Sequence, residues 1–405
     1  MPGTPVIQGL GISIIQMFGP GLQEEQVLPG RLSAGGRVLQ PGAQASLKGM
    51  GAGIQAGSQG DIAGKITGQL LKPQGFSPMT EQDLSQALIG MKQPANTMNL
   101  ALAQAMVKSG IPLDLENLTT LQTALSRVPG KGPMDMAAAC FLKANTLPVT
   151  PQNITILANF FSAHPMLGAQ LFELQDGLRR LVKGEGKGKS EIPALITRYV
   201  LNPAEKPEML KQALVRLARM AGMEKSDAKD QLQSELSRLQ ANIQGEEGWE
   251  ELATILGKLL QNIQAQRLIN QARPQESIGF YYLQVPLRLD EETPTMEFQV
   301  RYHVEEGGEK VVDPDNTMFE FQVEFEHLGR LDIKGEIHKS NLYLEIGTEM
   351  LEVAEFIRKH VPVLQDELEK LVYSVRKIEI TDINEDEEGG NQAKEQPLER
   401  VDLEI

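Results

Sequence analysis

Few side chains in this sequence have the types and spacing that catalysis or metal binding requires. The one cysteine, Cys140, lies among alanines and apolar residues, a setting typical of a small buried core residue. A single cysteine also leaves no partner within this sequence for a disulfide or a cysteine zinc cluster. The five histidines are His164, His303, His327, His338 and His360, and no two have a zinc-ligand spacing. His360 falls on the apolar face of an expected helix, which favours packing.

Nucleophilic and acid–base chemistry lack recognisable motifs as well. The sequence has no nucleophile elbow, no cysteine–histidine pairing and no convincing pair of catalytic carboxylates. We therefore predict a protein that is not an enzyme, with no catalytic residue, no metal site and no cofactor.

The glycine-rich segment 184–190, GEGKGKS, resembles a phosphate-binding loop at first sight. A Walker A motif needs a glycine at position 183, where this chain has Lys183, and it follows a strand. The apolar residues before this segment have helical spacing instead. We interpret the segment as a linker and expect no nucleotide site.

Overall charge excludes one class of partner. The net charge is −15 and the isoelectric point is about 5.0, so the chain lacks the basic face that a general nucleic-acid binder presents to phosphates. No apolar run approaches the ~20 residues that span a bilayer, and the first residues lack a basic region before their apolar stretch. We expect a cytoplasmic protein without membrane insertion.

Composition divides the chain into parts. Residues 1–75 are rich in Gly, Gln, Pro, Ala and Ser, which predicts a flexible arm. Residues 382–405 are acidic and poor in apolar side chains, which predicts a disordered tail.

An internal repeat indicates helices over residues 76–183. The segments PMTEQDL, PLDLENL and PVTPQNI begin at positions 78, 112 and 148, and apolar residues follow each at helical spacing. Thr80, Asp114 and Thr150 have the residue types that cap helix N-termini, and Pro151 suits the first helical position. We expect a repeat of helix pairs with a period of 34 to 36 residues. Residues 184–273 also have helical spacing, with long polar faces that predict a linker and a solvated spacer.

The spacing changes to the strand period of two after Pro274. Alternation predicts strands near 278–289, 296–304, 319–325, 331–337 and 342–346, with Pro286 at an edge or a break. A period of three to four residues then predicts a helix over 353–371, followed by a strand near 373–380. We therefore expect an α+β protein in which residues 274–381 form a small C-terminal domain, a β-sheet packed on one main helix.

This order of motifs resembles the C-terminal domain of the bacterial flagellar hook-length control protein family, in a divergent Gram-positive form. The resemblance rests on LGRLDI at 328–333, the hairpin strand at 341–346, VPVL at 361–364 with Leu368 after it, and the closing strand at 375–380. YYLQVPL at 281–287 fits the longer Gram-positive form. Two positions depart from the family pattern: Phe325 stands where proline is common, and no glycine follows the helix.

The resemblance implies a protein that measures hook length and switches export specificity from hook to filament substrates. It implies export through the flagellar channel without a cleaved signal peptide, and contact between the C-terminal domain and the export-gate switch protein of the flagellar type III apparatus. Hook or hook-cap subunits are further implied partners. We assign partner binding to the turn Leu328, Gly329 and Arg330 and to the helix face of Arg358, Lys359 and Gln365. We expect Gly329 to supply backbone freedom at the turn, where a simple hairpin or bulge remains an equal alternative to a binding role.

A second hypothesis stays open from the residues alone. The helical repeats are equally typical of an adaptor that is not exported and that binds a protein partner through its C-terminal sheet domain.

Overall fold

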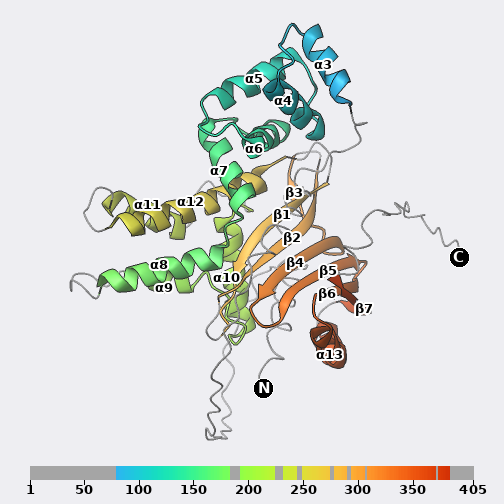
Figure 1. The fold of residues 1–405 in the computed structure, drawn as a ribbon. Helices are drawn as coiled ribbons and strands as arrows, with labels where there is room; N and C mark the ends of the chain where they lie inside the picture. Colours follow the sequence, from blue (N-terminus) through green and yellow to red (C-terminus); the bar gives the residue numbers. More distant parts are fainter. Residues whose placement is uncertain are drawn as a thin grey trace, which may run out of the picture.

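The computed structural model describes residues 79–182, 192–223, 231–243, 249–273, 278–289, 293–305, 308–370 and 373–383 (Figure 1). The predicted arm and the segment 184–190 lie outside these ranges, as does the predicted tail apart from its first two residues. The chain is a mixed helix and strand protein with a C-terminal mixed sheet, which confirms the predicted α+β class at that level.

Five helices form a helical array at the start of the described chain. They are α3 (Glu81–Gly90), α4 (Thr97–Lys108), α5 (Leu115–Ser126), α6 (Pro133–Ala144) and α7 (Pro151–Ala163). Each predicted N-cap is confirmed, because the side chains of Thr80, Asp114 and Thr150 accept hydrogen bonds from the backbone N–H three residues later. Their buried faces form one core, which includes Cys140.

The repeat is finer than predicted. The N-caps of these helices are 16 to 18 residues apart, at Thr80, Asn96, Asp114, Gly132 and Thr150. In three copies an asparagine amide donates to the carbonyl of the proline five residues earlier, at 2.7 to 3.2 Å. The repeating unit is therefore one helix with its turn, and the 34-to-36-residue period counts two such units.

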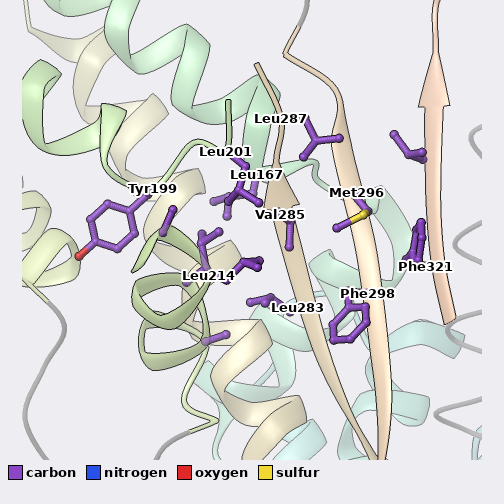
Figure 2. Close-up of a cluster of buried hydrophobic side chains, with 14 of the residues drawn as sticks. Leu167, Tyr199, Leu201, Leu214, Leu283, Val285, Leu287, Met296, Phe298 and Phe321 are labelled. Atoms are coloured by element: carbon purple, nitrogen blue, oxygen red, sulfur yellow. The ribbon is translucent and has the colours of Figure 1, made fainter. Parts of the chain in front are cut away.

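The next five helices of the described chain share one core with the sheet rather than forming a spacer. They are α8 (Leu167–Val182), α9 (Ile192–Thr197), α10 (Pro207–Met220), α11 (Gln231–Ile243) and α12 (Glu250–Gln271). Three of them, α8, α10 and α12, contact the strands of the sheet, and Figure 2 shows Leu167 and Leu214 gathered with Leu283 and Val285. The predicted boundaries at 183 and 274 thus do not separate cores. The apolar residues of α8 lie in the core of the sheet, and so do most of those of the helices within 192–273.

The sheet has the strand order β1-β2-β4-β5-β6-β7, with β3 beside β2. The strands are β1 (Ile278–Pro286), β2 (Thr295–Val304), β3 (Lys310–Val311), β4 (Asn316–Phe325), β5 (Gly329–His338), β6 (Asn341–Thr348) and β7 (Ser374–Asp382). Neighbours are antiparallel except β6 and β7, which are parallel and joined through α13 (Leu351–Glu369). The strands and helix predicted here are confirmed, as is Pro286 at the end of an edge strand. The pair β2–β3 was not predicted.

The two faces of the sheet differ in chemistry. One face carries the apolar residues of β1 to β7 and is covered by α8, α10 and α12 at one side and by α13 at the other. The opposite face carries most of the charged residues of the strands. Beside β1 this second face meets the helical array, because Tyr282 belongs to the core of the array.

Candidate functional site

The turn between β4 and β5 lies at one end of the sheet. Gly329 has a φ of +66°, which side chains other than glycine rarely adopt, so its predicted backbone freedom is confirmed. A Cβ added at position 329 would lie 3.6 Å from Sδ of Met350. The turn therefore packs closely against the connection from β6 to α13.

Three exposed apolar side chains belong to these two neighbouring connections. Leu328 is 43 % exposed, Met350 40 % and Leu351 68 %. Apolar side chains that remain in water on adjoining loops mark a surface suited to binding a partner. We call Leu328, Met350 and Leu351 the turn patch.

Arg330, predicted from the sequence to bind a partner, is buried and does not lie on this surface. Only 5 % of the residue is exposed, and its guanidinium binds Asp332 through two hydrogen bonds, Nε to Oδ1 at 2.8 Å and Nη2 to Oδ2 at 2.7 Å. Gln322 on β4 donates to the same carboxylate. This bidentate pair lies within β5, and the bond from Gln322 links the same carboxylate to β4.

The three predicted residues of α13 do not share one face. Arg358 and Gln365 follow Leu351 at seven-residue steps, so they project from the same side of the helix as the turn patch, about 10 and 21 Å further along it. Lys359 is turned by about 100° from Arg358. Arg358 and Lys359 are exposed, whereas Gln365 is half-buried and donates to Glu369 Oε1 at 2.9 Å. Of the six predicted residues, Leu328, Gly329 and Arg358 therefore lie on the same side of the molecule as the start of α13.

A buried polar cluster joins the helical array to the sheet, and sequence reasoning missed it. Its residues are all 8 % exposed or less, and come from the end of α7, from α8, α12, β1 and β2. We call this cluster the polar seam: His164, Gln170, Asn262, Gln266, Asn270, Tyr282, Gln284 and Glu297.

Amides of α12 complete the outer edge of β1. Asn270 accepts from the N–H of Tyr282 and donates to its carbonyl, both at 2.7 Å. Gln266 accepts from the N–H of Gln284 at 3.1 Å. Asn262, Gln266 and Asn270 are four residues apart and so line one side of the helix. The side chains of α12 therefore replace a missing strand along this edge.

Glu297 is the charged centre of the seam. The hydroxyl of Tyr282 donates to Oε1 of Glu297, and Nε2 of His164 lies 2.8 Å from the same oxygen. That approach has an ion-pair distance but not hydrogen-bond geometry, and within the described residues His164 Nε2 and Glu297 Oε2 have no hydrogen-bond partner. Burial, and then the Glu297 charge, raise the pKa of Tyr282 well above its ordinary value. The burial of these groups suits them to joining elements rather than to binding a substrate.

The sequence carried a signal for the seam. Three amides at four-residue steps interrupt the apolar stripe of α12, and Gln284 alternates with leucine and valine in a strand. Polar residues of this kind predict a solvated helix face, and for these three amides that prediction is wrong. Only the edge of β1, distant in sequence, shows why they are buried.

Two further ionisable side chains are removed from water, Lys310 in part and Cys140 completely. Lys310 on β3 donates to the carbonyls of Asn270 and Ala272, both at 2.6 Å, and so caps the C-terminal end of α12. Burial lowers the pKa of Lys310 to about 8, with a smaller effect from Arg273. Cys140 is fully buried, which confirms it as a core residue, and this burial raises the pKa of its thiol to about 12.

Searches for similar proteins gave no result: no family model, no curated protein and no solved structure matches this chain. Within the ranges that the structure describes, no three histidine, cysteine or acidic side chains are grouped as a metal site would require. In those same ranges, no helix has the length and apolarity to cross a membrane.

Proposed function

We propose that this chain acts in flagellar hook-length control, with the unit from β4 to β7 as the domain that switches export specificity. Its partner in this proposal is the export-gate switch protein of the flagellar type III apparatus, with hook or hook-cap subunits as further partners. The chain would begin in the cytoplasm and be exported through the flagellar channel without a cleaved signal peptide.

One observation carries the proposal. The chain folds as a hairpin with a glycine in the left-handed conformation at its turn, a second hairpin strand, a helix that contains Pro362, and a parallel closing strand. This is the order of elements that the family resemblance implies. The likeness rests on the sequence motifs and on this order.

The turn patch and the neighbouring side of α13 are the docking surface in this proposal. The exposed apolar residues at the centre of this surface would be buried by a bound partner. Arg358, further along α13, would bind an acidic group of that partner. Pro362 has no N–H to donate to the carbonyl of Arg358, which leaves the helix backbone locally weaker at this surface. Arg330 is buried beside this surface and pairs with Asp332 of the same strand, so it is not part of the docking surface in this proposal.

The polar seam favours a second candidate, an adaptor that is not exported. Export through a narrow channel requires the chain to unfold, and unfolding must break the hydrogen bonds by which the seam joins the end of α7, at the Pro165 carbonyl, to α12 and β1. The adaptor would keep the array and the sheet together while the turn patch binds a protein partner.

Deletion of the gene separates the two candidates. Hook-length control predicts hooks of uncontrolled length without filaments, seen by electron microscopy, and the chain itself in the culture medium of the complemented strain. Hooks of normal length that carry filaments would exclude the proposal. Abnormal hooks with the chain retained in the cell would favour the adaptor.

The docking surface is tested by complementation with the double variant Leu328→Asp/Leu351→Asp. We expect a stable protein, because both side chains are exposed, and loss of export-gate binding by at least tenfold in a pull-down titration. Ile89→Asp is the matched control, since Ile89 is 63 % exposed on α3 of the array. Equal binding by the double variant and the control would exclude the turn patch as the contact.

A further inference from the structure

The two edges of the sheet are treated differently. The outer edge of β1 is closed by the amides of α12 and by Leu201, whose N–H donates to Pro286 and whose carbonyl accepts from Arg288, both at 2.8 Å. β7 is the last strand at the opposite edge, and no strand within the described residues pairs with its outer side. A nine-residue strand that is open on one side is a template for another strand.

Apolar residues of β7 are incompletely covered. Val375, Ile378 and Ile380 pack against the core of the sheet but are only half-buried, whereas Leu344 and Ile346 on neighbouring β6 are 7 % and 3 % exposed. An added strand with apolar residues on the same face would complete their burial. This apolar rim is a second observation, independent of the open backbone.

The sequence of β7 is complementary to itself. Consider two copies of β7 paired antiparallel about a twofold axis at Ile378. Lys377 of each copy then lies opposite Glu379 of the other, so the pairing contains two such oppositely charged pairs. Both charged side chains lie on the solvent face, 60 % and 50 % exposed, where they pair with each other along the strand at 2.5 Å; a second copy offers each of them the same partner across the strands. Ile378 meets its own copy on the core face.

The bulge in β7 extends this match. Leu342 of β6 pairs with Val375 and Tyr343 pairs with Lys377, so Arg376 has no paired residue on β6. This bulge places Val375 on the core face together with Ile378 and Ile380. With Arg376 as the extra residue of the bulge, Val375 of each copy takes the place opposite Ile380 of the other copy. Bulges and lysines usually prevent edge pairing, but here the bulge aligns the apolar residues and the lysine finds an opposite charge.

We propose that β7 is a self-association edge, at which two copies of this chain pair antiparallel and join their sheets into one. The partner is thus a second copy of the chain, recognised by six apolar side chains on one face and two Lys377–Glu379 pairs on the other. This inference does not depend on the proposed function, because the turn patch and hook-length control play no part in it.

Charge reversal and rescue test the proposal with the full chain. Sedimentation velocity is measured from about 1 to 100 μM, the range in which an interface of one strand pair dissociates. We expect a dimer whose dissociation constant rises about tenfold in Lys377→Glu or Glu379→Lys, since each places like charges opposite one another twice. The double variant Lys377→Glu/Glu379→Lys restores the dimer. Lys370→Glu, an exposed lysine of the same type after α13, is the control and leaves the dimer unchanged.

Hydrogen exchange at residues 377–381 decides between the other outcomes. Protection that grows with protein concentration, and that is lost in Lys377→Glu, supports the proposal. A monomer at every concentration overturns it, and protection independent of concentration would show that another segment of the chain occupies the edge. A dimer that Lys377→Glu leaves intact would place the interface elsewhere and overturn the proposal as well. Circular dichroism of each variant confirms that the fold is retained.

Discussion

Gly335 lies directly beneath the ring of Phe319, its cross-strand partner on β4. A Cβ at position 335 would be 2.0 Å from Cζ of Phe319, far inside van der Waals contact. An aromatic ring laid over a glycine on the next strand compensates for the side chain that glycine lacks. This single residue therefore determines how Phe319 and its stacked neighbour Phe321 fill the middle of the core.

Gly335→Ala should destabilise the protein by about 1–3 kcal/mol, because the ring of Phe319 must leave its position in a packed core. Urea unfolding measures the change. Gly90→Ala is the control, since nothing lies within 4 Å of a Cβ there, and it should be neutral. Phe319→Leu should recover part of the loss in the alanine background. An equal, small effect of both alanines would contradict the packing argument.

At the scale of elements, α12 combines two tasks that usually belong to different segments. Its leucines pack in the core shared with the sheet, while its amides bond to the backbone of β1. An unpaired N–H or C=O in the interior costs about 1–3 kcal/mol, so a strand edge buried under a helix needs such polar side chains. The polar side of α12 is therefore structural.

Asn270→Ala should cost about 2–4 kcal/mol of stability, because it leaves both backbone groups of Tyr282 and the carbonyl of Ala221 without their partner. Urea unfolding gives the change, and hydrogen exchange of the Tyr282 amide should quicken with it. Gln271→Ala is the matched control, an amide on the same helix that faces solvent. If the two variants differed by less than about 0.5 kcal/mol, the edge-capping role would be wrong.

Elements that depend on neighbouring residues could be predicted, and those that depend on distant ones could not. The caps at Thr80, Asp114 and Thr150 bond only three residues away, so their types and positions were sufficient. The alternation of β4 to β7 likewise reports one buried face. Asn262 and Gln266 interrupt an apolar stripe, but the groups that make their burial possible lie far away in sequence, on β1 and at the end of α7. The candidate docking residues show the same limit: the freedom of Gly329 was predicted, but the burial of Arg330 was not.

At the scale of the whole molecule, the described residues form two apolar cores, and α12 enters both. Leu252 and Leu259 of α12 belong to the core of the sheet, and Leu268 and Ile269 belong to the core of the helical array. The boundary predicted at 274 followed Pro274, a local break in the helical spacing. Because a rigid helix of 22 residues links the cores and the polar seam lies between them, the array and the sheet should unfold together.

The single tryptophan and the single cysteine allow this coupling to be measured. Trp249 packs against the core of the sheet, and Cys140 is buried in the core of the array. At pH 8 the folded thiol, with its pKa raised to about 12, stays protonated and unreactive, while an unfolded thiol with a pKa of about 8.5 is labelled. We expect the urea midpoints from Trp249 fluorescence and from pulsed labelling of Cys140 to coincide.

Gln284→Ala, which removes bonds of the seam to α12 and to the end of α7, should lower the Cys140 midpoint more than the Trp249 midpoint. Two separate midpoints in the unaltered chain would mean that the cores unfold independently, and the seam would then be a contact without coupling.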